Sequence, residues 1–237
     1  MKTALITGAT HGIGRAISEA LASEGYALFI VSRHADELIP LADTLSTAAK
    51  VPVTPVALDV SDYQASARAF EQVHIDVLIN NAGCACISLL QDMTEADWDR
   101  VIDTNLKSVF NLTHAVLPGM IRRQNGVIIN ISSIWGVQGA SMEVAYSASK
   151  GGVNAFTKAL AREAAPSGIR VNAVACGIID TRMNQHLDPD EKTALAGKIG
   201  LGRFGNPGEV ADLVRYLISD QASYLTGQVI TLDGAMI

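Results

Sequence analysis

Short apolar runs recur along the chain, separated by longer segments with helical periodicity. Runs rich in Val, Ile and Leu, without polar alternation, are typical of strands buried on both faces. The predicted strands are Ala4–Thr7, Ala27–Ser32, Val53–Leu58, Val77–Asn80, Gly126–Ser132, Arg170–Ala175 and Gln228–Leu232. The helix-like segments are 12–24, 36–49, 62–73, 95–124, 145–166 and 207–219. This alternation predicts an α/β fold, a doubly wound parallel sheet with helices on both faces.

The chain shows no linker, repeat or low-complexity segment, so one domain spanning 1–237 is the simplest arrangement. Asp188-Pro189 and Asn206-Pro207 each offer an N-cap followed by proline, with a glutamate at the third helical position. Segment 180–206 contains no predicted strand, and glycines follow its short helix closely. We expect this segment to form a small substrate lid; an ordinary surface excursion is the alternative.

Composition narrows the class of partner. A formal charge of −6 argues against nucleic acid or an anionic membrane as the main partner. No apolar run approaches the roughly 18 residues that a membrane span needs, and residues 1–8 read as a strand entering a turn rather than a signal peptide. We therefore expect a cytoplasmic protein. The hydrophobic content of 49% fits a homo-oligomer that hides helical faces, although a large parallel sheet alone could explain it.

Three cysteines, Cys84, Cys86 and Cys176, occur without C-x-x-C spacing. An odd count with this spacing disfavours a disulfide framework and a zinc site, so no metal is expected. Small thiols in a reducing compartment are the simplest interpretation, and a reactive thiol is the alternative.

A glycine-rich segment, Thr7–Gly14, lies between the first predicted strand and the first predicted helix. Glycines let the backbone approach a pyrophosphate closely, and the helix N-terminus supplies free N–H groups and a positive dipole end. The position of this loop at the start of a βαβ unit predicts a dinucleotide site. The candidate binding residues are Gly8, Thr10, His11, Gly12, Ile13 and Gly14.

The end of the second predicted strand bears on the choice of dinucleotide. Folds that bind NAD usually place an Asp or Glu there, whereas this chain has Ser32 and Arg33. The guanidinium of Arg33 could pair with a 2′-phosphate, and His11 could add a second contact. We therefore expect NADP(H) to be preferred over NAD(H).

Tyr146 and Lys150 are spaced to share one face of a predicted helix, thirteen residues after Ser133. Two charges about 4 Å apart interact by roughly 4 kcal/mol at an effective dielectric near 20. That corresponds to about three pKa units, so we expect the ammonium to lower the pKa of the phenol. Such a tyrosine would suit proton donation to a carbonyl. A core tyrosine beside a solvated lysine is the alternative.

The motifs together resemble the short-chain dehydrogenase/reductase family, nearly end to end. Thr7–Gly14 resembles its T-G-x-x-x-G-x-G loop and Asn80–Gly83 resembles its N-N-A-G segment. The family's catalytic tetrad is matched in order and spacing by Asn105, Ser133, Tyr146 and Lys150. The resemblance implies a Rossmann-like sheet of about seven strands. It also implies a dimer or tetramer built on the helices that begin near residues 104 and 145.

The resemblance also assigns roles. Tyr146 would donate the proton while hydride arrives from the nicotinamide, and Ser133 would hydrogen-bond the carbonyl oxygen. Lys150 would lower the pKa of Tyr146 and bind the nicotinamide ribose, and Asn105 would hold a water that links Lys150 to solvent. The remaining implied cofactor contacts are Asp59 and Val60 at the adenine, Asn81, Ala82 and Gly83 at the adenosine ribose, and Ile179 and Thr181 at the carboxamide. Cys176 replaces a proline that is usual in the family, which implies a looser loop.

Within the family, Leu201–Pro207 and Leu225–Gln228 most resemble 3-oxoacyl-(acyl-carrier-protein) reductases. Such enzymes dock an acidic carrier with basic residues, for which Arg122 and Arg123 are candidates, whereas Ser167 stands where a second basic residue could lie.

Other substrates stay open. The segment 132–136 with 139–141 resembles a reductase of a 5-aminopentanone modification on elongation factor P, and Trp135 could line its substrate site. A small free ketone is a third possibility. A non-catalytic NADP(H)-binding sensor or scaffold is opposed by the intact tetrad.

Overall fold

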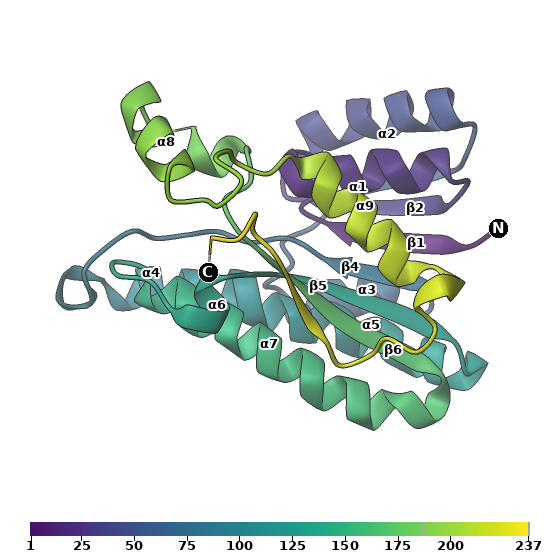
Figure 1. The fold of residues 1–237 in the computed structure, drawn as a ribbon. Coiled ribbons are helices and arrows are strands. Elements are labelled where there is room, and N and C mark those ends of the chain that lie inside the picture. Colours follow the sequence, from purple (N-terminus) through teal and green to yellow (C-terminus); the bar gives the residue numbers. More distant parts are fainter. Residues whose placement is uncertain (186, 237) are drawn as a thin grey trace.

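One parallel sheet forms the centre of the molecule (Figure 1). The computed structural model describes residues 1–185 and 187–236. The strands lie in the order β3-β2-β1-β4-β5-β6-β7, and each pairs in parallel with its neighbours. Their bounds are β1 Thr3–Thr7, β2 Ala27–Ser32, β3 Val53–Ala57, β4 Val77–Asn80, β5 Gly126–Ser133, β6 Ile169–Cys176 and β7 Val229–Leu232. All seven predicted strands are present, with ends displaced by one residue at most.

Helices cover both faces of the sheet, as the pattern predicted. Their bounds are α1 Gly12–Ser23, α2 Ala35–Ala49, α3 Tyr63–Phe70, α4 Glu95–Ile102, α5 Ser108–Arg123, α6 Trp135–Gln138, α7 Val144–Ala164, α8 Pro189–Ala196 and α9 Pro207–Ile218. One core packs α1, α2 and α9 against the sheet, and a second packs α3, α5 and α7 against the opposite face. Successive strand residues point to opposite faces, so β1 to β6 contribute to both cores, whereas β7 packs only against the first. The expected doubly wound, Rossmann-like single domain is confirmed.

The predicted long helix over 95–124 is interrupted. Asp103–Lys107 forms a π-helical segment between α4 and α5. An i→i+5 segment of this kind is rare and inserts an extra residue into the helix, which rotates the side chains that follow. Asn105 lies within it and is fully buried. Apolar periodicity predicted one uninterrupted helix and did not reveal this break.

A buried polar ladder ties the sheet to two helices. Asn80 and Asn130 are register partners on β4 and β5, and Nδ2 of Asn80 donates to Oδ1 of Asn130 at 2.9 Å. Nδ2 of Asn130 in turn donates to Oγ1 of Thr157 on α7 at 2.8 Å. Because buried amides are costly unless paired, these bonds fix the position of α7 relative to the strand ends.

The segment 180–206 emerges beyond the carboxyl end of the sheet and carries α8 (Figure 1). The predicted capping boxes at Asp188 and Asn206 are both present. Helix α8 buries none of its residues, whereas the base of the segment is pinned by a bridge between Ile179 and Gly205. Position 186, inside this segment, lies outside the described residues. No helix in the described part of the chain is long and apolar enough to cross a membrane.

Candidate active site

A cavity of about 620 Å³ opens at the carboxyl ends of the strands. This is where ligands bind in doubly wound sheets, and its volume is in the range of small-molecule sites. It is lined by nearly all the predicted site residues, namely Gly8, Thr10, His11, Gly12, Ile13, Arg33, Asp59, Val60, Asn81, Ala82, Gly83, Ser133, Tyr146, Lys150, Ile179 and Thr181. Of the predicted residues, Gly14 and Asn105 do not line it and lie behind its wall.

The glycine loop forms one wall of the cavity and requires its glycines. Gly8 has a φ of +63°, a conformation that favours glycine. A Cβ on Gly14 would lie 2.1 Å from the carbonyl oxygen of Gly8, so no larger residue fits there. The loop therefore presents bare backbone at the start of α1. These residues fit a pyrophosphate, which such a loop and helix N-terminus bind through N–H groups.

Thr7 and Asn81 brace this loop, a function that the sequence motifs did not reveal for Thr7. Its Oγ1 accepts from the backbone nitrogens of Asn81 and Ala82 at 2.9 and 3.0 Å. The side chain of Asn81 donates to the carbonyl oxygens of Thr7 and Gly8 at 2.9 and 3.1 Å. Its amide therefore holds β1 and β4 at a fixed spacing.

At the other end of the cavity, Arg33 lies beside Asp59. Burial raises the pKa of the Asp59 carboxyl, but hydrogen bonds from Ser61 and the charge of Arg33 outweigh that effect, and the pKa is lowered overall. Asn111, which the motifs missed, donates to the carbonyl oxygens of Val60 and Ser61 and fixes this turn.

Ser133, Tyr146 and Lys150 meet in the deeper part of the cavity. Ser133 ends β5, and Tyr146 and Lys150 lie one turn apart on α7. The side chains of Ser133 and Tyr146 are hydrogen-bonded. Nζ of Lys150 donates to the carbonyl oxygen of Ile131 at 2.8 Å and lies 5.8 Å from the centroid of the Tyr146 ring. The predicted constellation is therefore assembled, with the ammonium over the ring face.

The expected lowering of the Tyr146 pKa is wrong. Burial raises the pKa of the phenol well above 10, the hydrogen bond with Ser133 lowers it only in part, and the charge of Glu143 raises it further. Burial also lowers the pKa of Lys150, to about 8. Removal from water disfavours each charged form, and this cost exceeds the attraction between the two groups.

Asn105 is held by the loop that follows β4. Its Oδ1 accepts from the backbone nitrogen of Cys84 at 2.8 Å, and its Nδ2 donates to the carbonyl oxygen of Cys84 and to Oγ of Ser149. Both ends of this amide are thus engaged within the protein. Asn105 therefore positions the Gly83–Cys84 backbone against α7, and a water that it holds would have to use its backbone carbonyl.

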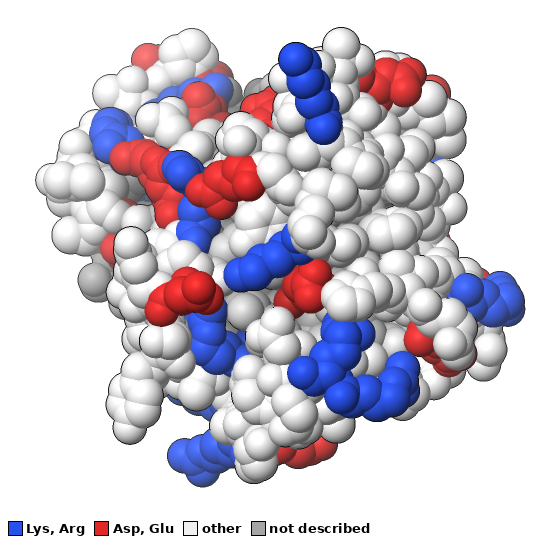
Figure 2. Space-filling model, turned by 90° about the vertical axis from the view of Figure 1, so that its right-hand side faces the viewer, with Lys and Arg blue, Asp and Glu red and all other residues white. Residues whose placement is uncertain are grey.

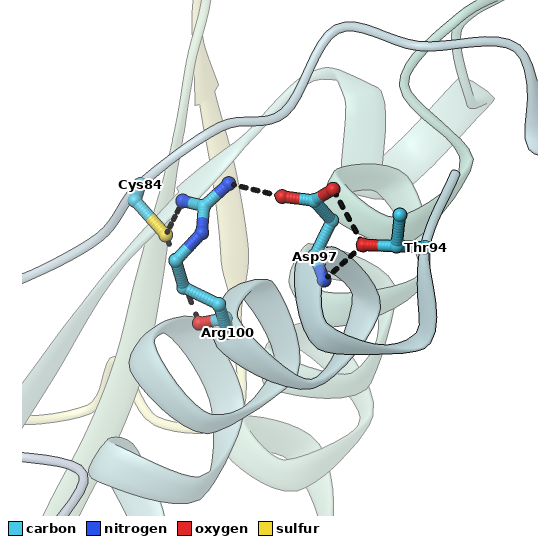
Figure 3. A network of polar contacts seen from close by, with 4 residues as sticks. All are labelled: Cys84, Thr94, Asp97 and Arg100. Atoms are coloured by element: carbon cyan, nitrogen blue, oxygen red, sulfur yellow. Dashed lines mark hydrogen bonds and ion pairs between the residues drawn. The ribbon is translucent and has the colours of Figure 1, made fainter. Parts of the chain in front are cut away.

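The same loop is fixed from its outer side by α4 (Figure 3). Arg100 donates to Sγ of Cys84 at 3.5 Å and to Oδ1 of Asp97 at 3.2 Å. Asp97 in turn interacts with Thr94, whose Oγ1 caps the helix. The network connects the N-terminus of α4 to the residue that binds Asn105.

Cys176 lies at the end of β6 and lines the cavity. Burial raises the pKa of its thiol to about 12, so it is a weak nucleophile at neutral pH. Trp135 and Glu143 also line the cavity, and the side chain of Glu143 has no hydrogen-bond or ion-pair partner among the described residues. Glu143 gave no signal in the sequence.

Arg122 and Arg123 lie far from this cavity within the chain. They end α5, which leads into the first residue of β5, whereas Ser133 ends that eight-residue strand. At about 3.3 Å per residue, the distance between the two ends of β5 is on the order of 25 Å. Arg123 is also bound to the carbonyl oxygen of Ile75 at 2.6 Å. The face where β1 begins shows basic and acidic side chains interspersed (Figure 2).

Sequence similarity leads to the same family as the glycine loop, the tetrad and the strand order. Residues 2–192 match the family described as short chain dehydrogenase. The chain belongs to the short-chain dehydrogenase family. It is therefore an oxidoreductase of C=O and CH–OH groups, in a family that binds a nicotinamide cofactor.

Several known proteins are similar to this chain over its whole length. A 3-oxoacyl-[acyl-carrier-protein] reductase FabG of Thermotoga maritima is 43% identical, over 100% of this chain and 98% of that protein. The uncharacterized oxidoreductase YmfI of Bacillus subtilis is 42% identical, over 98% of each. A crystal structure of a 3-oxoacyl-[acyl-carrier protein] reductase with bound NAD from Brucella melitensis has a TM-score of 0.93 at 33% identity, covering 99% of this chain and 90% of that one.

Proposed function

We propose that this protein is an NADP(H)-dependent reductase of a ketone, with a 3-oxoacyl thioester on acyl carrier protein as its substrate. The observation that carries the proposal is the meeting of Ser133, Tyr146 and Lys150 in a cavity whose other end is the glycine loop. The full-length similarity to 3-oxoacyl-[acyl-carrier-protein] reductases supports the substrate.

The cofactor, when bound, supplies the hydride. The glycine loop would hold its pyrophosphate, Asp59 and Val60 its adenine, and Ile179 and Thr181 its carboxamide. Arg33 is exposed and has no ion-pair partner within 4 Å among the described residues, so its guanidinium is available for a 2′-phosphate. This availability supports the preference for NADP(H), although Asp59 competes for the same charge.

In this proposal Tyr146 is the proton donor. A raised pKa keeps its phenol protonated at neutral pH, so the proton is present when the substrate binds. Ser133, already hydrogen-bonded to the phenol, would share the carbonyl oxygen with Tyr146 and stabilise its developing charge. Lys150 would bind the nicotinamide ribose hydroxyls and return a proton to Tyr146 after each turnover.

The identity of the substrate is tested with a panel of candidate ketones in a spectrophotometric NADPH-oxidation assay. The panel contains a carrier-bound 3-oxoacyl chain, its coenzyme A analogue, simple ketones and elongation factor P bearing the 5-aminopentanone. Tyr146→Phe removes the donor, and Ser147→Ala, one residue further along α7, is the matched control.

We expect the highest kcat/KM for the carrier-bound 3-oxoacyl chain and a loss of at least 100-fold in kcat in Tyr146→Phe. A higher kcat/KM for modified elongation factor P or a simple ketone would replace the substrate while keeping the reaction. Turnover by Tyr146→Phe within a few-fold of wild type would refute the mechanism. No turnover of any ketone would favour a binding protein without catalysis.

A further inference from the structure

Arg182, His11 and Glu37 meet at the rim of the cavity, between the glycine loop and the first turn of α2. Arg182, from the start of the 180–206 segment, donates to Nε2 of His11 and lies 3.4 Å from Oε1 of Glu37. Nε2 of His11 lies 3.5 Å from Oε2 of the same carboxylate. Arg182 and His11 line the cavity. No motif identified Glu37 or Arg182.

The position of Arg182 is fixed by the backbone around it. Nitrogen and oxygen atoms of residues 178–180 and 205 pair at the base of the segment, with Asp180 N to Gly205 O at 2.8 Å. Thr181 packs against the glycine loop, because a Cβ on Gly12 would lie 2.9 Å from its Cγ2. Arg182 is therefore only one residue beyond a contact with the loop that fits a pyrophosphate.

The carboxylate of Glu37 holds the guanidinium weakly. A strong charge-assisted N–H···O bond measures about 2.7–2.9 Å, whereas the Arg182–Glu37 distance is 3.4 Å. Oε2 of Glu37 is buried and has no hydrogen-bond partner among the described residues. A guanidinium with 60% of its side chain exposed, beside one incompletely satisfied carboxylate, can exchange that partner for a phosphate, which it binds in bidentate fashion.

We infer that Arg182 is a further cofactor-binding residue: its guanidinium moves away from Glu37 and pairs with a phosphate group of the dinucleotide. Glu37 is the competing carboxylate that holds Arg182 when no cofactor is bound. The inference deepens the proposed function and rests on its nicotinamide dinucleotide. The pyrophosphate and the 2′-phosphate share the chemistry that Arg182 recognises, and NADH and NADPH distinguish them because only NADPH carries the second.

The experiment measures dissociation constants of NADPH and NADH by calorimetry, with no substrate present. The variants are Arg182→Gln, Glu37→Gln and the double variant. Arg215 and Glu24 form a matched exposed pair on α9 and after α1, outside the cavity, so Arg215→Gln and Glu24→Gln are the controls.

In Arg182→Gln we expect the NADPH dissociation constant to rise at least fivefold. An equal rise for NADH assigns Arg182 to the pyrophosphate, and a rise confined to NADPH assigns it to the 2′-phosphate. In Glu37→Gln we expect tighter binding by at least twofold, and this gain should vanish in the Arg182→Gln background, because the cycle isolates their coupling.

Dissociation constants of both cofactors within twofold of wild type in Arg182→Gln would overturn the inference alone. A gain from Glu37→Gln that persists without Arg182 would also overturn it, since it would reflect general repulsion between Glu37 and the phosphates. A wild-type protein that binds neither cofactor would refute the proposed function itself.

Discussion

Lys150 should destabilise the fold at neutral pH, and its replacement by methionine measures how much. The ammonium is buried, with a pKa lowered from 10.5 to about 8 by that burial. At 1.36 kcal/mol per pKa unit, keeping it protonated at pH 7 costs about 3 kcal/mol of unfolding free energy. Lys150→Met removes this cost but leaves the carbonyl oxygen of Ile131 without its 2.8 Å donor, which costs about 1–3 kcal/mol.

The pH dependence is the sharper measure, because the lost hydrogen bond contributes equally at each pH. The folded pKa lies below the unfolded one, so between them the unfolded chain binds more protons and wild-type stability rises with pH. The cost of the ammonium falls from about 3 kcal/mol at pH 7 to about 2 kcal/mol at pH 9. The stability of Lys150→Met relative to wild type should therefore fall by about 1 kcal/mol between these two pH values.

Urea unfolding of the cofactor-free protein at pH 7 and pH 9, at one protein concentration, tests this expectation. Lys158→Met is the matched control, because Lys158 lies on the same helix but is exposed. The difference in unfolding free energy between Lys158→Met and wild type should be the same at both pH values. An equally constant difference for Lys150→Met would refute the burial argument for the active-site lysine.

Three further perturbations test other parts of the structure. Gly14→Ala should destabilise the fold by about 2 kcal/mol and weaken NADPH binding, because the added Cβ would overlap the Gly8 carbonyl oxygen. The control is Gly208→Ala, whose Cβ would meet nothing within 4 Å and which should leave the free energy of urea unfolding unchanged. Glu143→Gln should lower the pKa of Tyr146, because the carboxylate raises it; ¹³C NMR titration of labelled tyrosine checks this, and an unmoved pKa contradicts it. We propose that α5 forms an oligomer face, where Phe110 is exposed and stacked on Tyr63. Phe110→Glu should therefore lower the molar mass of the protein measured by light scattering. Ile39→Glu, at an exposed position on α2, should leave that molar mass unchanged.

The sheet could be predicted from the sequence because a strand buried on both faces has a simple signature. Its apolar runs, such as Val77–Asn80, need no partner to be recognised, and all of β4 is buried. The glycine loop was equally accessible, because its glycines are demanded by local backbone geometry and close approach. For buried strand residues and loop glycines, the residue type alone indicates the local environment.

Other parts of the site depend on contacts between distant segments, which no local pattern encodes. Thr7 and Asn81 are 74 residues apart, yet their hydrogen bonds fix the loop. The pairing of Arg182 with Glu37 spans 145 residues. The π-helical segment at Asn105 also escaped prediction, because apolar periodicity does not distinguish it from the helices on either side.

The pKa of Tyr146 shows how a correct spacing can lead to a wrong energy. The i, i+4 spacing does place Lys150 beside Tyr146, but the ammonium lies over the ring face and bonds to Ile131 instead of the phenolic oxygen. The two charges attract each other, but taking both from water costs more than this attraction returns. In the cofactor-free protein that cost dominates, so Tyr146 stays protonated while Lys150 loses basicity. A lowered phenol pKa therefore requires a change in this site that brings solvent or additional polar groups to Lys150.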